Sequence, residues 1–439
     1  MTNHWPLFGG IYNGRLLFMR NLKGLLSNRF YSFVFLSVAV ILLIRTGYRT
    51  FDSIVKYDWW GLQDYLFNYA GGFIRRGLTG EVIFYITECT GIPSLVVSYA
   101  VSIIAYIIVA IFAIYSFRRQ GYAINVLIMS FMLGSIFMTS INDMRRDFIE
   151  MAIFIGIIVS YKRLKTGSWI VLGNICAIFA ILLHEATFLF MVPVFVLMTN
   201  IRLNNPVKSI SSWLPSIAAF IGCCLYKGTP EMLPAMCAHI REYAPEALAN
   251  GDVPPLLQFV GKDTSSVIAL HIGYNFTDPL SRYFPIPVLF VTLFYLIYIP
   301  FITVCMIKVF NRDGLSEGRQ NTLVSLILFQ FVMLLPMFTV LSCDLLRVAM
   351  YWMMSSVILW LWLSDKEINA MFMPGFNKFS AKVSAKCFDR RLPGKMVLTL
   401  CMLFVGICYY QRTFSEILYR SPGVKVLSFI KTIVESIFN

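Results

Sequence analysis

Charged side chains are scarce in this chain: Asp, Glu, Lys and Arg make up only 14% of its 439 residues. A soluble domain is usually about one quarter charged and about half apolar, whereas 58% of this chain is hydrophobic. The apolar residues fall into repeated runs, each roughly as long as a helix needs to cross a bilayer. The composition therefore excludes an ordinary soluble domain and predicts an all-α, polytopic transmembrane helical bundle.

Motifs for metals, disulfides and nucleotides are also missing. Most of the 10 cysteines lie inside apolar runs, without a Cys-x-x-Cys pair, so we expect small core residues rather than disulfides or metal ligands. His239 and His271 lie near carboxylates but lack a metal-ligand spacing. The chain has no Walker motif and no Gly-rich nucleotide loop. We therefore expect no metal site and no cofactor.

The apolar runs predict about eleven spans within a single membrane domain, 1–439. They lie roughly at 31–44, 97–117, 123–140, 148–161, 168–183, 187–201, 209–226, 284–308, 322–342, 348–364 and 396–410. No signal-peptide pattern precedes the first run, so we expect an uncleaved first span. The partly apolar segment 81–95 is expected to lie in the membrane interface, and 411–439 to form an amphipathic surface segment.

The basic residues predict the orientation. Short loops at 117–121 and 161–167 and the stretch 365–395 are rich in Lys and Arg, which places them and the N-terminus in the cytoplasm. The formal charge of +14 thus reflects topology and does not argue for nucleic acid. Two long loops, 45–96 and 227–283, then lie outside, the second as a small cap with a helix or two. We expect a multi-pass protein of the bacterial inner membrane.

The outside cations are mostly arginine, whereas lysine and arginine are nearly even inside. A planar guanidinium binds phosphate or carboxylate through two parallel hydrogen bonds, which an ammonium group does not. Four segments on the outside carry these groups. They are GGFIRRGLTG (71–80), SINDMRRDFIE (140–150), LLHEATF (182–188) and SCDLLRVAMYW (342–352). Since charge near hydrocarbon is costly and faces cavities or other charges, we expect the four segments to form one polar chamber.

Each of these signals has an alternative, purely structural interpretation. Arg75 and Arg76 can extend to lipid headgroups, although the adjacent glycines, which tolerate positive φ and close backbone approach, favour a place beside an anionic ligand. Arg145 and Arg146 can pair with Asp143 and Asp147, and Asp344 with Arg347 three residues later. His184 can be an interfacial histidine bonded to a carbonyl. The aromatic residues around 57–69 suit either a membrane-interface belt or stacking on sugars.

Arginines, aromatic residues and a few carboxylates in one outer chamber suit a lipid-anchored, phosphorylated sugar substrate. Arginines would bind the phosphates and stabilise the leaving group, and a carboxylate or histidine would deprotonate the acceptor hydroxyl. The candidate phosphate ligands are Arg75, Arg76, Arg145, Arg146 and Arg347; the catalytic candidates are His184, Glu185 and Asp344; the sugar-binding candidates are Asp58, Trp59, Trp60 and Asp64.

The order of four motifs, GGFIRRGLTG, NDMRRDFIEMAIF, LLHEATFLFMVPVF and CDLLRVAMYW, resembles the Wzy/EpsG-type polymerases of bacterial surface polysaccharides. The resemblance covers mainly 68–200 and 343–352. It implies a metal-independent transferase that joins repeat units from an undecaprenyl-diphosphate donor, with the five arginines as phosphate ligands and His184 with Glu185 on the acceptor side. It also implies membrane lipids and a chain-length regulator or flippase of the same pathway as partners. The expected outward C-terminus departs from many of these polymerases.

Two other functions are compatible with the sequence. A GT-C-type serotype-converting glycosyltransferase would move one sugar from a polyprenyl-phosphate donor, using an acidic residue of the first outer loop such as Asp52, Asp58 or Asp64. A polysaccharide-precursor transporter is the third possibility, against which stand the missing inverted repeat and the few charges placed within spans.

Overall fold

In the computed structural model, the structure describes residues 65–119, 146–245, 260, 297–301, 303–305, 307, 315–341, 345–388 and 422–438. Every regular element in these ranges is helical, as the sequence predicts. Three helical segments are long and apolar enough to cross a membrane: Ser94–Ser116, Thr166–Leu183 and Glu317–Leu341. The chain therefore has the character of a helical membrane protein, and the predicted number of spans stays a prediction.

Most predicted spans that lie in the described ranges coincide with helices. These are α4 (Ser94–Arg119), α6 (Asp147–Tyr161), α7 (Thr166–Leu183), α8 (Thr187–Leu203), α14 (Glu317–Pro336) and α15 (Leu345–Trp362). The predicted span 209–226 is instead divided into α9 (Pro206–Ser211) and α10 (Leu214–Leu225). Pro215 has no N–H to bond the carbonyl of Ser211, which interrupts a continuous helix there. The runs 31–44, 123–140 and 396–410, and most of 284–308, lie outside the described residues.

The basic stretch 365–395, expected on the cytoplasmic side, contains two short helices, α16 (Asp365–Met371) and α17 (Pro374–Phe388). Ser364 and Glu367 explain the start of α16. The Ser364 hydroxyl accepts from the Glu367 N–H, and the Glu367 carboxylate accepts from the Ser364 N–H at 2.7 Å. This reciprocal cap satisfies backbone donors at the helix start. The expected amphipathic C-terminal segment is helical as α20 (Pro422–Phe438), with Leu427 and Ile430 exposed.

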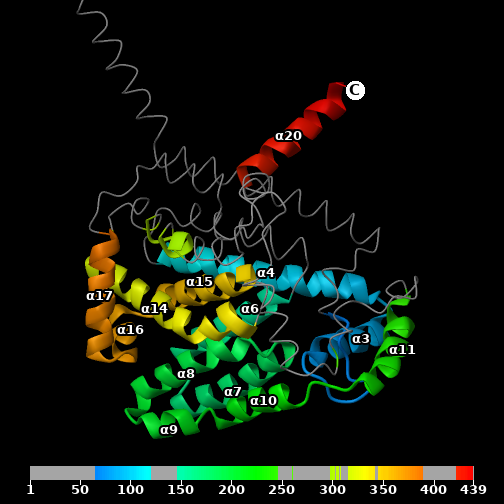
Figure 1. Cartoon of the computed structure of the whole chain (residues 1–439), viewed down its shortest axis with the longest axis horizontal. Coiled ribbons are helices and arrows are strands. Elements are labelled where there is room, and N and C mark those ends of the chain that lie inside the picture. The colour runs from blue at the N-terminus through cyan, green and yellow to red at the C-terminus, as the bar shows by residue number, and fades with distance from the viewer. Residues whose placement is uncertain are drawn as a thin grey trace, which may run out of the picture.

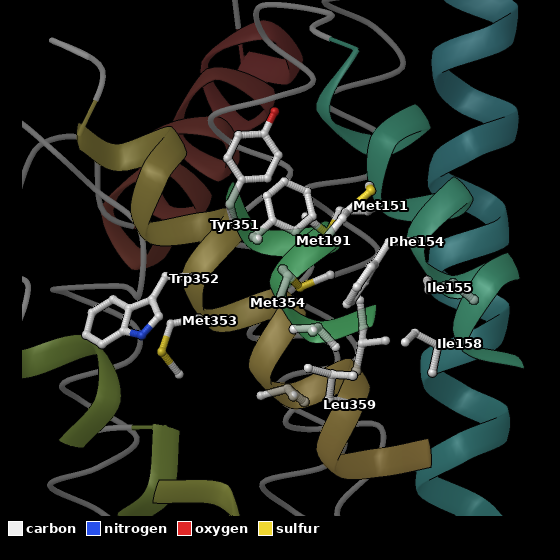
Figure 2. Packing of buried hydrophobic residues seen from close by; sticks show 14 of the residues in the cluster. Met151, Phe154, Ile155, Ile158, Met191, Tyr351, Trp352, Met353, Met354 and Leu359 are labelled. Carbon is white, nitrogen blue, oxygen red and sulfur yellow. The ribbon is translucent and has the colours of Figure 1, made fainter. Parts of the chain in front are cut away.

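The long helix α15 forms the centre of the bundle, in contact with α4, α6, α8 and α14 (Figure 1). Every residue from Val348 to Leu363 is buried, as expected for a helix that is apolar on all sides. Figure 2 shows side chains of α15 packed against Met151 and Phe154 of α6 and Met191 of α8. Tyr351 lies at one end of this core, with its hydroxyl directed away from the methionines.

At the end of the bundle that carries α16 and α17 (Figure 1), cations contact the last carbonyls of long helices. Arg319 donates to the carbonyls of Leu363 (3.0 Å) and Trp360 at the end of α15. Arg202 donates to the carbonyls of Leu164 (3.0 Å) and Tyr161 at the end of α6. Positive charge stabilises helix C-termini, where carbonyls lack intrahelical partners. This end of the molecule is therefore held together by buried and half-buried cations.

At the other end of the bundle, the two long loops of the sequence meet. The first contributes α3 (Gly77–Thr90), and the second contributes a 3₁₀ turn, η2 (Pro230–Met232), followed by α11 (Leu233–Tyr243). Their shared apolar cluster consists of Leu66, Phe67, Ile74, Phe84, Met236, Ile240, Ala244 and Val260. The expected cap helix is thus α11, and the expected interfacial segment 81–95 is largely α3. The cap fixes the loop that carries Arg75 and Arg76.

The glycines around these arginines approach other parts of the protein. Gly72 has φ +118°, a conformation that disfavours other residues. A Cβ on Gly71 would lie 2.6 Å from the carbonyl oxygen of Met232, and one on Gly80 would lie 2.7 Å from that of Tyr65. The sequence predicts that these glycines let the backbone approach a ligand closely. In the structure Gly80 instead packs the first long loop (45–96) against its own backbone, and Gly71 packs it against the second (227–283).

The close packing at Gly80 should be measurable as a change in protein stability. Gly80→Ala should destabilise the protein by about 1–3 kcal/mol, because the added methyl group overlaps backbone carbonyls that cannot move aside as a side chain would. Gly222→Ala in α10 is the matched control, since nothing lies within 4 Å of a Cβ there; it should be neutral or stabilising by up to about 1 kcal/mol. Unfolding titrations in mixed micelles measure both. Equal effects of the two substitutions would contradict the packing assigned to Gly80.

Candidate functional site

Polar side chains from four separate segments meet beneath the α3/α11 cap and form what we call the polar cluster. They come from the loop before α3, the first turn of α6, the turn between α7 and α8, and the first turns of α15. The cluster comprises Arg75, Arg76, Arg146, Asp147, Glu150, His184, Glu185, Arg347 and Tyr351. The central geometric expectation from the sequence, that these segments converge, agrees with this arrangement.

Arg76 and Glu185 form the outer pair of the cluster. Arg76 donates from Nε to Glu185 Oε2 at 2.8 Å and from Nη2 to Oε1 at 2.6 Å, which is the bidentate geometry that guanidinium and carboxylate favour. Arg75 Nη1 lies 3.7 Å from Glu185 Oε1. Both arginine side chains remain partly accessible, at 28% for Arg75 and 25% for Arg76. Glu185 therefore holds two adjacent guanidinium groups at the accessible edge of the cluster.

The backbone at Arg76 has an unusual conformation. Arg76 precedes α3 with φ 68° and ψ 6°, a left-handed conformation that is uncommon for residues other than glycine. Such local strain persists only where the surroundings fix it, and it occurs preferentially at functional sites. Here the bond to Glu185 and the nearby guanidinium of Arg146, 3.5 Å from the Arg76 carbonyl oxygen, provide that fixation.

The protonation states of the α7–α8 turn follow from this environment. Burial alone would raise the pKa of Glu185, but Arg76 and Arg75 hold it well below its usual value, so the group is a carboxylate. Burial, reinforced by Arg76 and Arg347, lowers the pKa of His184 well below its usual value, so the imidazole is neutral. The turn thus presents one carboxylate and one neutral imidazole.

Arg347 and Asp147 form the inner pair. Arg347 Nε lies 2.7 Å from Asp147 Oδ1 and 2.9 Å from Oδ2, and its Nη2 also bonds Oδ1. Asp147 is fully buried and accepts a further hydrogen bond from the Tyr351 hydroxyl at 2.6 Å. Arg347 and Tyr351 are four residues apart and so lie on one face of α15. This pair links the starts of α6 and α15.

Arg146 and Glu150, like Asp147, are charged residues of the cluster whose side chains are inaccessible. Arg146 Nε lies 4.0 Å from Glu150 Oε1, and its Nη1 lies 3.4 Å from the Thr79 hydroxyl of α3. Glu150 Oε2 is 2.6 Å from the Tyr351 hydroxyl and 3.6 Å from His184 Nδ1. Arg146 therefore lies behind Arg76, where it supports the α3 start.

Four helices begin at the polar cluster: α3 after Arg76, α6 after Arg146, α8 after Ala186, and α15 two residues before Arg347. The first N–H groups of a helix lack intrahelical partners and carry partial positive charge. Their convergence adds to the guanidinium charge and makes the accessible edge of the cluster favourable for an anion.

Six of the predicted site residues belong to the cluster, and they are Arg75, Arg76, Arg146, His184, Glu185 and Arg347. The others, Asp58, Trp59, Trp60, Asp64, Arg145 and Asp344, lie outside the described residues. The pairing differs from the sequence-based alternatives. Asp147 binds Arg347, 200 residues away, and Arg146 Nε lies 4.0 Å from Glu150 Oε1. Whether these residues bind phosphate or transfer protons stays a prediction.

Asp147, Glu150 and Tyr351 are cluster members that the sequence-based site did not include. Their signals were present in the sequence: two carboxylates in the first turn of an apolar helix, and a tyrosine four residues after an arginine. An isolated carboxylate inside a span is expensive, so each implies a partner. The identity of that partner depends on helix packing, which the local sequence does not specify.

Among the residues that the structure describes, no group of three or more His, Cys, Asp and Glu side chains is arranged to hold a metal ion. Comparison with known proteins gives no relative: no family model, no curated protein and no solved structure matches this chain.

Proposed function

We propose that this chain is a membrane glycosyltransferase that joins undecaprenyl-diphosphate-linked oligosaccharide repeat units at the periplasmic face, in the synthesis of O-antigen, capsule or exopolysaccharide. The observation that carries the proposal is the convergence of arginines from three distant segments with the His184–Glu185 turn. A buried group of guanidiniums at helix starts suits a diphosphate. The sequence resemblance to Wzy/EpsG-type polymerases supports the same reaction.

In this reaction, the bond between the sugar anomeric carbon and the diphosphate oxygen breaks, and the diphosphate leaves with the electron pair. An acceptor hydroxyl forms the new glycosidic bond and gives up its proton. Arg75 and Arg76, at the accessible edge, contact the diphosphate and stabilise the charge that develops on it. The two parallel hydrogen bonds between Arg76 and Glu185 hold the guanidinium plane in one orientation at this edge.

The acceptor side of the proposed site is the α7–α8 turn. Glu185 is a carboxylate and His184 a neutral imidazole, and both states are able to accept the hydroxyl proton. Arg146, which is inaccessible, positions Arg76, and Arg347 positions α6 against α15. Under this proposal the cations at the α16/α17 end lie in the cytoplasm with the N-terminus, and the polyprenyl tail lies in the membrane along the helices. A flippase and a chain-length regulator of the same pathway are the proposed partners.

The surface glycan of cells carrying Arg75→Ala tests the proposal. We expect long chains to fall by about tenfold or more, and single repeat units to accumulate, because one charge-assisted contact to the diphosphate is lost. Arg241→Ala is the matched control, since Arg241 is an exposed arginine on α11 at the same end of the molecule; it should leave the chain-length ladder unchanged. Electrophoresis of the extracted glycan measures the chain-length distribution in both variants.

Three other results would contradict polymerisation. A ladder of normal length that lacks a branch sugar indicates the GT-C-type transferase. Lipid-linked repeat units that accumulate on the cytoplasmic leaflet indicate a transporter. An unchanged ladder in Arg75→Ala removes Arg75 from the site.

A further inference from the structure

The helix α17 carries lysines on the side that points away from the rest of the protein. Lys378, Lys382 and Lys386 follow one another at intervals of four residues, so they lie along one side of the helix, and all three are exposed. Ser380 and Ser384 lie on the opposite side and are buried. Because α17 packs against α14, its small residues face the bundle and its three lysines, which we call the lysine ridge, face outward.

Beside the lysine ridge, the same helix exposes apolar side chains. Phe379 is 55% exposed and lies seven residues before Lys386, which places both on the same side of the helix. Phe376 and Val383 are half-buried on the flank next to Phe379, and Met373, just before the helix, is 81% exposed. Lysines next to exposed aromatic and aliphatic side chains are typical of helices that lie in the membrane interface.

The place of α17 in the fold agrees with an interfacial helix. It contacts α14, which belongs to the segment Glu317–Leu341, long and apolar enough to cross a membrane. Figure 1 shows α17 running across the direction of the long helices α4 and α15, at one end of the bundle. Three charged side chains on its outer side are too costly for the hydrocarbon core. We therefore expect the lysine ridge at the level of the headgroups, within reach of their phosphates.

We propose that α17 is a docking site for anionic phospholipids, whose headgroups bind the lysine ridge while Phe379 enters the boundary of the acyl chains. Charge complementarity identifies this occupant. Phosphatidylglycerol carries a net negative charge, whereas phosphatidylcholine is neutral overall, and only the first offers a net attraction to three exposed cations. Each basic residue near an anionic membrane surface strengthens the attraction about fivefold, so the composition of the leaflet should determine how firmly α17 is held.

Native mass spectrometry of the full-length protein in a neutral detergent tests the charge. We expect the wild-type protein to bind phosphatidylglycerol at least about tenfold more tightly than phosphatidylcholine at low ionic strength, and this preference to weaken as salt is added. In the triple variant Lys378→Gln, Lys382→Gln and Lys386→Gln, the two lipids should bind within about threefold of each other. A wild-type protein that binds both lipids equally would overturn the proposal.

A second triple variant controls for the general loss of charge. Arg163→Gln, Lys165→Gln and Lys208→Gln remove the same number of exposed cations from the same end of the molecule, without touching α17. This variant should keep most of the preference for phosphatidylglycerol. If it loses as much of the preference as the variant of the lysine ridge, the binding does not belong to α17.

Tryptophan fluorescence tests separately whether α17 meets the bilayer. In Phe379→Trp, the emission added to that of the 8 native tryptophans should be quenched in nanodiscs whose phosphatidylglycerol carries bromine on its acyl chains, and should persist when the lipid is not brominated. This measurement leaves every lysine in place, so it does not depend on the folding of the triple variant. Added emission that is not quenched would overturn the proposal, and binding of a soluble polyglutamate peptide to the lysine ridge would then identify an acidic protein as its partner.

Discussion

Arg347→Met should lower the free energy of unfolding by about 3–5 kcal/mol, because it leaves the Asp147 carboxylate buried without its cation. Asp147 is inaccessible and receives its charge-assisted hydrogen bonds from Arg347. Met has a similar length and no polar atom that needs a partner, so the loss reports the uncompensated charge. Unfolding of the purified protein in mixed micelles gives the measurement.

Two controls separate this effect from a general loss of charge. The double variant Arg347→Met with Asp147→Asn removes both charges and should recover a large part of the loss, which makes the two substitutions strongly non-additive. Lys431→Met breaks the exposed pair with Glu435 in α20, whose side chains are 75% and 57% accessible, and should change stability by less than about 1 kcal/mol. If Arg347→Met behaves like Lys431→Met, the inner pair does not hold α6 to α15.

Arg76→Lys should lower the rate of repeat-unit joining by about 100- to 1,000-fold, because lysine keeps the charge but loses the fork that aligns donors with the diphosphate. The left-handed backbone at position 76 is equally strained for both residues, and lysine keeps a charge that Glu185 can pair with, so stability should change much less than the rate. Purified protein in nanodiscs with a lipid-diphosphate-linked repeat unit, followed over single turnovers, gives the rate.

Glu185→Gln distinguishes the orientation of the Arg76 guanidinium from its charge. It weakens the bond that orients Arg76 and keeps the arginine itself, so we expect a smaller loss than in Arg76→Lys if Glu185 only positions Arg76. A loss as large as that of Arg76→Lys would place Glu185 in direct contact with the acceptor. A rate within threefold of wild type for Arg76→Lys would contradict bidentate binding by Arg76.

Much of the fold follows from the sequence because the signals are local. The uniformly apolar run 348–364 predicts a buried helix, and α15 is buried along its whole apolar length. In the basic stretch 365–395, the capping pair Ser364 and Glu367 marks the start of a helix that the Lys and Arg content alone does not indicate. Local capping signals therefore add elements to what composition indicates.

The membership of the polar cluster was partly predictable, and its pairing was not. The cost of charge near hydrocarbon correctly indicates that Arg76, Arg146, His184 and Arg347 gather. Which carboxylate each arginine binds depends on how α6, α15 and the α7–α8 turn pack together. An argument from local sequence favours ion pairs between residues close in the chain, whereas Arg347 binds Asp147, 200 positions away.

The packed glycines beside Arg75 and Arg76 determine how these side chains meet a ligand. Gly71 and Gly80 fit directly against backbone carbonyls, and Glu185 already fixes the guanidinium of Arg76. Ordering a long side chain on association costs about 0.5–1.5 kcal/mol of entropy. That ordering occurs here when the chain folds, so a lipid-linked anion that binds as we propose would meet side chains already in place, and its affinity would depend on how well its own shape fits.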